Sequence, residues 1–479
     1  MAAENKRPPV SISELVQLRN FGIPADQVTW SRVTMISDQW IAVRHDSRDR
    51  KMSNVTVLNP REGTKIYAGS TFADSLLMNP SHPLIALKAN LRFEVFNVGN
   101  KVLVSKTDML ERVIFWTWVN SDIIAIITDS TVYHWDLWQG DSPPENVFQR
   151  HDRLTFSEII SYKADPSLKW LAITGLTPEE DRISGVTQLY NVDEDITQCI
   201  NSHAVCFTHY RFDDNPLPST VFCVASRDTQ DKGKIHIIEL GPYKHGNFAP
   251  RNSYTEIQFT DDTERYDFPI SIQVSEEYGL LYMVTKYGYL YLCDMETAAC
   301  LCVTRVSIDI VFTSTLNSIS QGILGVTRTG RILSVDIKKD LLIAQIRESA
   351  KWANQANRLE RVMAGKGQNK EESSKKDQIP HKNKNHNNNN NLSFQVNNNT
   401  NTNRTTTTNN TTTTITTTTR SSIAHVSSSS CSTSCSSSMM KDCSKVPLLL
   451  SPSSLPTICY EDSDSRSSHS QEEASESDS

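Results

Sequence analysis

Apolar and polar residues alternate in blocks along the first two thirds of the chain. A run of strand-forming residues is followed by a short polar break and a second such run, and this unit recurs about seven times between Val33 and Lys338. The best-preserved copies read YGLLYMVTKYGYLYLCDM, SDIIAIITDSTVYHWDL and QGILGVTRTGRILSVDI. Their apolar residues alternate or run continuously, with Val, Ile, Thr, Tyr and Phe dominant, which is typical of strands. Each unit therefore predicts two strands joined by a turn, a β-hairpin.

The spacing of these hairpins predicts the architecture. The last apolar residue before each central turn recurs at steps of 44, 40, 46, 51, 60 and 42 residues. A propeller blade of four strands takes roughly 40–50 residues. The long steps contain DDNPLPS, RDTQDKG and GPYKHGNFAPRNS, which are typical of loops. We predict an all-β, seven-bladed propeller, or six or eight blades if one weak copy is miscounted. The anchoring residues are Val43, Leu87, Ile127, Ile173, Val224, Val284 and Val326.

Composition divides the chain into three parts. We predict a propeller over residues 1–340, a helical linker fragment over 341–365 and a disordered tail over 366–479. Apolar residues at helical spacing from Leu341 to Met363 predict one amphipathic helix. The tail consists largely of Asn, Thr, Ser and Lys, and it has too little apolar surface to offset the entropy of ordering. Its last 19 residues carry seven acidic residues against one Arg, and they account for much of the net charge of −7.

The composition argues against several classes of function. No strongly basic face is implied, so nucleic acid is not an expected partner. The N-terminus has no apolar signal region, and no run approaches the roughly 20 apolar residues that span a bilayer. The cysteines lack the paired spacing of a zinc site, so we expect no metal and no cofactor. Cys293 and Cys302 lie in strand-like runs and are predicted to be buried thiols. Cys431, Cys435 and Cys443 lie in the Ser-rich part of the tail.

An enzyme is not favoured, because the common catalytic motifs are absent. His134 and Asp136 flank Trp135 and would share one face of a strand, so a catalytic pair is conceivable. We favour a surface polar pair beside a buried Trp. Asp213 and Asp214 precede Asn-Pro and are interpreted as turn residues. We therefore expect no catalytic residue, and a platform whose grooves present pockets and strand edges to extended peptides.

Longer strings in the chain resemble a known family. LVQLRNFGIPADQVTWSRVTMISDQWIAVR, LMNPSHPLIALKA, FWTWVNSDIIAIITDSTVYHW, KWLAITG, TQLYNVD, GKIHIIELG, YDFPISIQVSEEYGLLYMVTKYGYLYLCDMETA and GILGVTRTGRILSV occur in that order between about Leu15 and Val335. Together they resemble the amino-terminal domain of the clathrin heavy chain. The resemblance implies a seven-bladed propeller that captures short linear motifs of endocytic adaptors beneath a coat. It also implies a cytoplasmic protein on the cytoplasmic face of coated pits and vesicles, associated with the membrane through adaptors.

The resemblance implies a first groove, between the first two blades, for an extended acidic-hydrophobic peptide called the clathrin box. Ile85 and Phe96 match its apolar wall, and Lys101 matches one of two basic positions. The second basic position holds Leu103. Arg92 replaces a small hydroxyl residue, and Glu94 replaces Gln. Apolar pockets for alternate side chains and a cation for the acidic end are what such a site needs.

Two further grooves follow from the same resemblance. In the arrestin-type groove four residues match and one acid replaces a base; in the Trp-motif site on top of the propeller an acid replaces Gln. We expect each added acid to weaken the binding of acidic peptides by on the order of 1 kcal/mol. The arrestin-type positions are Trp170, Leu189, Ile196 and Gln198, with Glu194 as the added acid, and the Trp-motif positions are Trp30, Ile160 and Glu158.

The family continues from the propeller into a long helical leg that trimerises and binds light chains. Here the low-complexity tail follows instead, so we expect this chain to be monomeric, with a light chain as partner only if a leg exists in the full product. The tail is either a real extension of a shortened relative or translated intron or repeat sequence, and a transcript read across Lys366 distinguishes the two. Residues before Val33 are expected to pair with the last blade, because a propeller must protect its edges.

Three functions remain to be distinguished. The first is a structural component of the clathrin coat whose propeller binds adaptor motifs in vesicle-mediated transport. The second is a protein-interaction scaffold or adaptor decoy that does not assemble. The third is a propeller enzyme, for which His134 and Asp136 are the candidate residues. Binding to adaptor tails and co-sedimentation with coats separate the first two.

Overall fold

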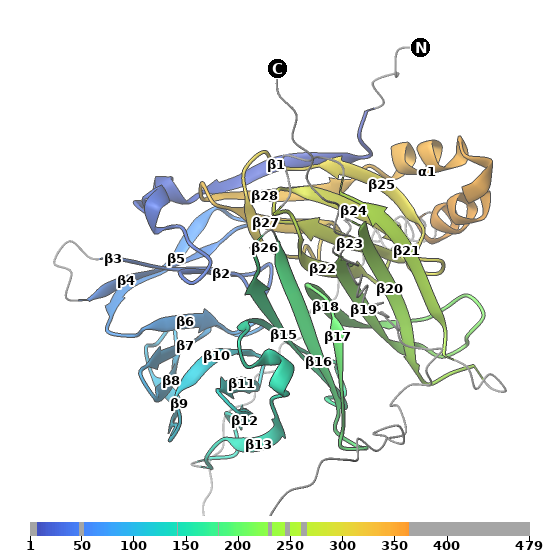
Figure 1. The fold of residues 1–479 in the computed structure, drawn as a ribbon. Helices are drawn as coiled ribbons and strands as arrows, with labels where there is room; N and C mark the ends of the chain where they lie inside the picture. The colour runs from blue at the N-terminus through green and yellow to red at the C-terminus, as the bar shows by residue number, and fades with distance from the viewer. Residues whose placement is uncertain are drawn as a thin grey trace, which may run out of the picture. The chain divides into compact units, whose positions relative to one another are not determined.

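The strands of the molecule form seven separate antiparallel sheets. The computed structural model describes residues 7–363, with gaps at 47–51, 141, 181, 229–231, 245–249 and 260–265, so the predicted tail over 366–479 lies outside the described residues. Each sheet contains four strands, and six of the seven follow the order of the chain. Each sheet is one blade, and the strands are coloured in sequence around the molecule (Figure 1). The prediction of a seven-bladed propeller is confirmed.

The blades are numbered along the chain. Blade 1 contains β2 (Val33–Thr34), β3 (Ile41–Asp46), β4 (Ser53–Asn59) and β5 (Thr64–Thr71), and blade 2 contains β6 (Ser75–Met78), β7 (Leu84–Ala89), β8 (Arg92–Asn97) and β9 (Leu103–Asp108). Blade 3 contains β10 (Val113–Trp118), β11 (Ile123–Thr128), β12 (Thr131–Asp136) and β13 (Glu145–Gln149), and blade 4 contains β14 (Glu158–Ala164), β15 (Trp170–Pro178), β16 (Ile183–Asn191) and β17 (Ile196–Asn201). Blade 5 contains β18 (Ala204–Tyr210), β19 (Ser219–Arg227), β20 (Lys232–Gly241) and β21 (Asn252–Gln258), and blade 6 contains β22 (Pro269–Ser275), β23 (Leu280–Thr285), β24 (Tyr289–Asp294) and β25 (Cys300–Arg305). Blade 7 contains β26 (Val311–Leu316), β27 (Ile323–Thr327), β28 (Arg331–Ile337) and β1 (Val10–Gln17).

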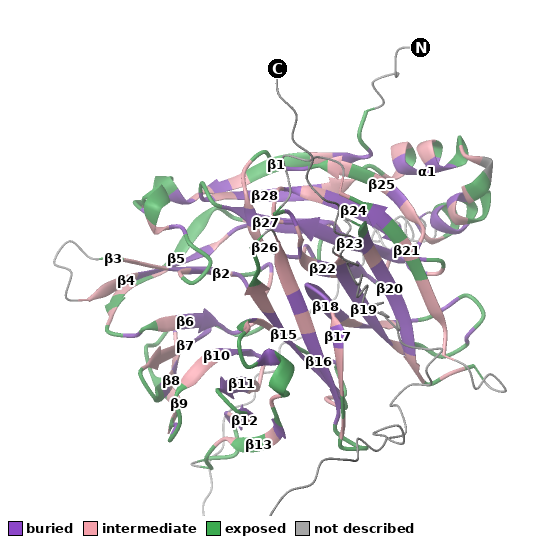
Figure 2. Ribbon diagram, in the orientation of Figure 1, coloured by how far each residue is buried: buried purple, intermediate pink, exposed green. Residues whose placement is uncertain are grey.

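The hairpins predicted from the sequence are the second and third strands of the blades. All seven anchoring residues lie in second strands, from Val43 in β3 to Val326 in β27. Two of these strands are buried on both faces along their whole length: every residue of β23 and of β27 is buried. Figure 2 shows the burial concentrated in the middle of the blades. Since strands covered on both faces read as continuous apolar runs, they gave the clearest signal in the sequence.

The seventh blade joins the two ends of the propeller. β1 pairs antiparallel with β28, with Val10 opposite Ile337 and Gln17 opposite Arg331. Figure 1 shows the blue β1 beside the orange β28. The prediction that residues before Val33 pair with the last blade is confirmed. This pairing covers the outer edge of β28, which would otherwise be free to pair with another chain.

Hydrophobic clusters fill the spaces between successive blades, including the space between blade 7 and blade 1. Between blades 2 and 3, Phe93 packs edge-on against Trp116 with ring centroids 5.2 Å apart. Trp135 lies in the same cluster and is 1% exposed, as predicted for this Trp. The blades are therefore held together mainly by side-chain burial, since each sheet makes its ladder hydrogen bonds within itself.

Two helices follow the propeller. α1 (Lys339–Arg347) is separated from a second helix over residues 353–363 by a turn in which Ser349 has φ −98° and ψ 112°. The prediction of one helix from Leu341 to Met363 is wrong. A straight helix of that length would extend about 35 Å, whereas the turn allows both apolar faces to pack against the same part of the propeller.

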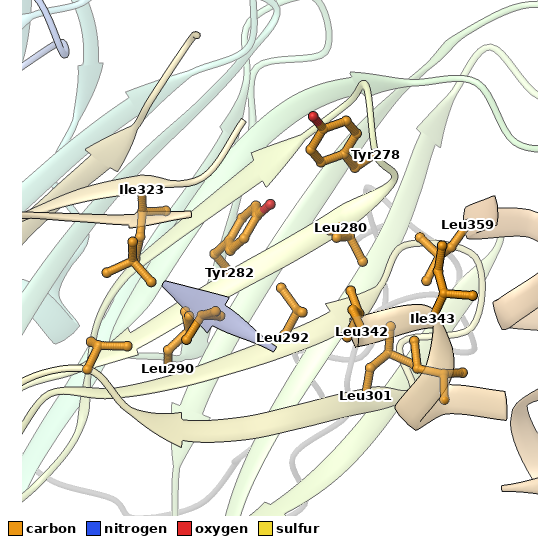
Figure 3. Packing of buried hydrophobic residues seen from close by; sticks show 14 of the residues in the cluster. Tyr278, Leu280, Tyr282, Leu290, Leu292, Leu301, Ile323, Leu342, Ile343 and Leu359 are labelled. Carbon is orange, nitrogen blue, oxygen red and sulfur yellow. The ribbon is translucent and has the colours of Figure 1, made fainter. Parts of the chain in front are cut away.

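The apolar faces of both helices enter the cluster between blades 6 and 7. Figure 3 shows Leu342 and Ile343 of α1 and Leu359 of the second helix beside Leu280, Leu292 and Leu301 of blade 6. Leu342 and Leu359 are fully buried. The two helices are thus part of the hydrophobic core between blades 6 and 7.

Candidate peptide-binding site

A cavity of about 220 Å³ opens between blades 1 and 2. It contains three of the five residues predicted for the first groove: Ile85, Phe96 and Lys101. Blade 1 contributes Val55, Tyr67, Ser70 and Thr71 from β4 and β5, and blade 2 adds Leu87, Asn97 and Val98. The cavity therefore lies where the sequence predicted a groove for an extended peptide, and we call it the 1–2 groove.

The apolar wall of the 1–2 groove belongs to the core between the two blades. Ile85 lies directly opposite Phe96 in the β7–β8 ladder, and Ile85 is 4% exposed. Both pack in one cluster with Val55 and Val98. Because this wall is fixed by the blade interface, its shape is set before any ligand binds.

Lys101 is held at the rim of the 1–2 groove by the turn between β8 and β9. Its backbone has a positive φ of 59°, and its N–H donates to the carbonyl of Asn97 at 2.8 Å. The Asn97 side chain accepts from the N–H of Gly99 at 2.9 Å, which closes the turn. Lys101 is exposed and is the one cationic residue among those lining the described cavity. The rim therefore offers a positive charge next to an apolar wall.

The other two predicted residues, Arg92 and Glu94, form an ion pair instead of lining the cavity. The Arg92 Nε lies 2.8 Å from Glu94 Oε1, and the two side chains are 50% and 30% exposed. They share the face of β8 that carries Phe96, because alternate residues of a strand point the same way. The ion pair was not predicted from the sequence, and in it the charge of Arg92 offsets that of Glu94.

The arrestin-type residues gather on three adjacent strands of blade 4. Trp170 in β15 and Leu189 in β16 are buried in the cluster between blades 4 and 5. Gln198 in β17 lies opposite Leu189, and its side-chain oxygen is buried without a hydrogen-bond partner in the described part of the chain. Ile196 begins β17 and is partly buried, while the exposed Glu194 lies in the preceding turn. A buried acceptor beside an apolar wall is suited to a ligand that brings a donor.

The Trp-motif residues lie on different blades. Trp30 is 42% exposed in the loop before β2 of blade 1. Glu158 and Ile160 both lie in β14 of blade 4, whose pairing with β15 shifts register between Ile159 and Ser161. Within the described residues, no hydrogen bond or ion pair connects Trp30 to either of them. Glu158 and Ile160 thus belong to one strand, and their association with each other and with Trp30 in a site stays a prediction.

The comparisons with known proteins agree with this architecture. The family of clathrin propeller repeats matches residues 204–241, which span β18 to β20 of blade 5. The clathrin heavy chain of Drosophila melanogaster is 37% identical over 338 residues, which are 71% of this chain and 20% of that protein. Clathrin heavy chain 2 of Homo sapiens is 35% identical over 335 residues, 70% of this chain and 20% of the relative. The propeller belongs to the clathrin heavy chain family. The whole chain, however, spans about a fifth of the length of these relatives.

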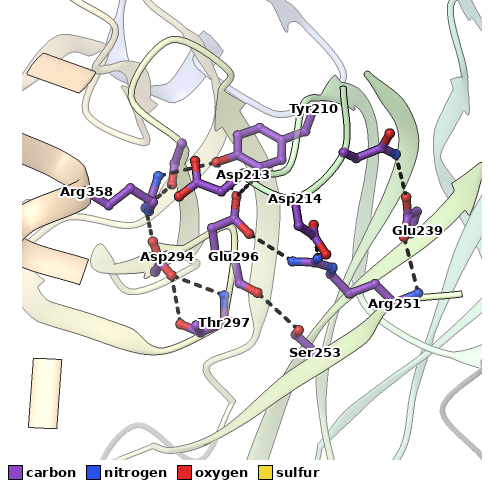
Figure 4. A network of polar contacts seen from close by, with 12 residues as sticks. Tyr210, Asp213, Asp214, Glu239, Arg251, Ser253, Asp294, Glu296, Thr297 and Arg358 are labelled. Carbon is purple, nitrogen blue, oxygen red and sulfur yellow. Dashed lines mark hydrogen bonds and ion pairs between the residues drawn. The ribbon is translucent and has the colours of Figure 1, made fainter. Parts of the chain in front are cut away.

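A second cavity, not predicted from the sequence, lies where the clathrin-type propeller meets its second helix. It measures about 790 Å³ and is bordered by the loop after β18, the turn after β22 and the helix residues Arg358 and Val362. Arg358 forms a buried ion pair with Asp294 (Figure 4). Arg251 bridges Asp214 and Glu296, the latter at 2.9 Å, and burial raises the pKa of Glu296. Asp214 is thus an ion-pair partner as well as a turn residue.

The candidate enzymatic pair of the clathrin-type propeller has structural contacts instead. His134 Nε2 lies 2.7 Å from the hydroxyl of Tyr162 in blade 4, and burial lowers its pKa to about 4. His134 is thus partly exposed and also contacts the next blade, while the Trp135 that it flanks is buried as predicted. Asp136 accepts a hydrogen bond from the N–H of Trp138 at 2.8 Å, which fixes the turn after β12.

Other expectations about the described residues can be compared directly. Cys293 is buried as predicted, while Cys302 is partly buried. Within the described ranges, no cluster of three or more His, Cys, Asp or Glu has the arrangement of a metal site. None of the helices described there has the length and hydropathy needed to cross a bilayer.

Proposed function

We propose that this chain is a receptor for short linear motifs of endocytic adaptor proteins, which it binds in the 1–2 groove. One observation carries the proposal: the cavity combines the wall of Ile85 and Phe96 with Lys101 at its rim. An extended acidic-hydrophobic peptide would place alternate apolar side chains on the wall and its acidic end beside Lys101. A short peptide in this groove would bury less surface area than a stable protein interface does, so individual motifs should bind weakly and reversibly.

Removing the rim charge tests this arrangement. We expect Lys101→Ala to weaken the binding of a fluorescent clathrin-box peptide about three- to fivefold at low salt, since a partly exposed charge pair is worth up to about 1 kcal/mol. The difference should shrink as salt screens the pair. Fluorescence anisotropy measures both effects. Lys351→Ala, an exposed lysine on the helical segment, is the control and should bind like the unchanged chain. Equal affinity for Lys101→Ala at low salt would contradict the proposal.

Glu94 gives a second test of the 1–2 groove. The acid should make binding weaker than in a family member with Gln at this position. We expect Glu94→Gln to tighten binding of the same peptide by up to about fivefold, because Arg92 then loses its partner and is available to the acidic end of the ligand. The double variant Arg92→Gln with Glu94→Gln distinguishes the effect of the two charges. It should bind the peptide without the gain in affinity expected for Glu94→Gln alone. An affinity unchanged by Glu94→Gln would show that the pair does not influence the ligand.

We also propose a role as a structural component of the clathrin coat in intracellular protein transport, supported by the relatives named clathrin heavy chain. In that role the chain acts in the cytoplasm and reaches coated membranes through adaptors. The alternative is a scaffold or decoy that binds adaptors without assembling. Co-sedimentation with coats assembled from complete heavy chains tests the choice. A chain that binds adaptor tails but remains in the supernatant is the decoy.

A further inference from the structure

The tail contains one segment whose composition matches the 1–2 groove. Residues 446–464 read VPLLLSPSSLPTICYEDSD, whereas most of residues 366–445 are Asn, Thr, Ser and Lys. Eight apolar residues lie between Val446 and Tyr460, and the acids Glu461, Asp462 and Asp464 follow at once. An apolar stretch with an acidic end is the ligand chemistry that an apolar wall with a lysine at its rim would recognise.

The prolines of this segment favour the conformation that a groove between blades requires. Pro447, Pro452 and Pro456 fix their own φ near −65°, and they restrict the preceding residues to extended backbone. A helix through this segment is therefore disfavoured, and the entropy lost on binding as an extended peptide is reduced. The segment thus resembles a preorganised linear motif.

Charges around the 1–2 groove favour the acidic end of the segment. Lys101 is exposed at the rim, and Arg92 holds Glu94 in an ion pair at 2.8 Å. Lys106 lies directly opposite Glu94 in the β8–β9 ladder. Arg92 and Lys106 together outweigh the charge of Glu94, so the net charge of β8 and β9 here does not repel a negatively charged ligand.

The length of the intervening chain allows the contact. Residues 364–445 separate the second helix from the segment, which is 82 residues. A flexible linker of this length has a root-mean-square end-to-end distance of about 50 Å. A domain of the propeller's size has a radius of gyration of about 20 Å, so a linker of this kind spans the whole body. The effective concentration of a tethered ligand is on the order of 1 mM or somewhat less.

We propose that residues 446–464 occupy the 1–2 groove of their own chain and compete there with adaptor motifs. The inference rests on the proposed function, because it takes this groove as the receptor for acidic-hydrophobic peptides. A segment with a Kd of about 100 μM would be bound about ten to one at an effective concentration of about 1 mM. Adaptor motifs would then bind the free fraction, and their apparent affinity would fall about tenfold.

The test uses the complete chain and two complete variants. The tail variant carries Leu448→Ser, Leu449→Ser and Leu450→Ser; the matched control carries Ile415→Ser, Ile423→Ser and Val426→Ser elsewhere in the tail. All three proteins are titrated into a fluorescent clathrin-box peptide. We expect the tail variant to bind about tenfold more tightly than the unchanged chain, and the control to bind like the unchanged chain.

The outcomes separate this inference from the proposed function. If all three proteins bind the peptide with equal affinity, the groove is a receptor but the tail does not occupy it. If none binds, the proposed function fails and the inference fails with it. An apparent affinity of the unchanged chain that falls as its own concentration rises would indicate docking onto a second copy and would overturn the intramolecular contact.

A direct competition provides a second measurement. A synthetic peptide of residues 446–464 should displace the fluorescent clathrin-box peptide from the tail variant. Adding Lys101→Ala to that variant should weaken the synthetic peptide three- to fivefold, as expected for an acidic end beside this lysine. Failure to displace the probe at millimolar concentration would overturn the proposal.

Discussion

Arg358→Met is expected to lower the free energy of unfolding by about 3–5 kcal/mol, because it leaves a buried carboxylate without its partner. Asp294 is fully buried at the end of β24, and Arg358 in the second helix is 5% exposed. The Arg358 guanidinium also contacts the Tyr210 hydroxyl at 3.3 Å and the Gly279 carbonyl at 3.4 Å (Figure 4). Among the residues that the structure describes, Asp294 then keeps the bonds from the backbone N–H of Thr297 at 3.1 Å and from the Thr297 hydroxyl at 2.8 Å. The urea midpoint measures the loss.

Two further variants show that the effect comes from the buried charge. Arg347→Ala removes an ion pair with Glu360 whose side chains are 46% and 50% exposed, and it should change stability by no more than about 1 kcal/mol. Adding Asp294→Asn to Arg358→Met removes the unpaired charge while an amide oxygen can still accept from Thr297, so it should recover part of the loss. If Arg358→Met were no worse than Arg347→Ala, the second helix would not be anchored by this pair. A large loss would mean that the segment predicted as a separate linker fragment unfolds together with the propeller.

Most of the fold could be predicted because its signal is local. Second strands such as Leu280–Thr285 and Ile323–Thr327 are buried on both faces, so they read as continuous apolar runs, and the spacing of the second strands gave the number of blades. The helix break could not be predicted in the same way. Leu342 and Leu359 are compatible with one helix by periodicity, and only their shared contact with blades 6 and 7 requires the turn at Ser349. Tertiary packing decided what local pattern left open.

In the candidate site, too, some features could be predicted from the sequence and others depend on the three-dimensional arrangement. Ile85 and Phe96, which the family resemblance assigned to one wall, face each other across the β7–β8 ladder. The Arg92–Glu94 pair and the Arg358–Asp294 pair depend on side-chain geometry, which the order of residues does not reveal. The second pair also joins positions 64 residues apart. The polar cavity beside it was missed because its residues come from two blades and a helix, and no motif connects them.

Acid should destabilise this propeller through two buried histidines, His203 and His236, and the partly buried His134. Burial lowers the pKa of His134, His203 and His236 to about 4 in each case, from an ordinary value near 6.5. All three are neutral at pH 7 whether the chain is folded or unfolded. Below pH 6.5 these histidines become protonated in the unfolded chain, whereas in the folded chain they become protonated only near pH 4. The free energy of unfolding therefore falls as the pH is lowered across this window. Each histidine should remove about 2 kcal/mol between pH 7 and pH 5.

His236 allows this contribution to be isolated. It is 6% exposed in β20, stacks on Tyr254 with ring centroids 5.5 Å apart, and lies beside Asn252, whose side chain opposes part of the lowering of its pKa by burial. His236→Phe keeps the ring and removes the titration, so it should preserve stability at pH 7. It should also reduce by about 2 kcal/mol the stability lost on going to pH 5, as measured by urea midpoints at the two pH values. Tyr254→Phe alters the same stacked pair but leaves His236 in place, and it should retain the full loss. An unchanged acid sensitivity in His236→Phe would mean that this side chain is hydrated well enough to take up its proton in the folded propeller.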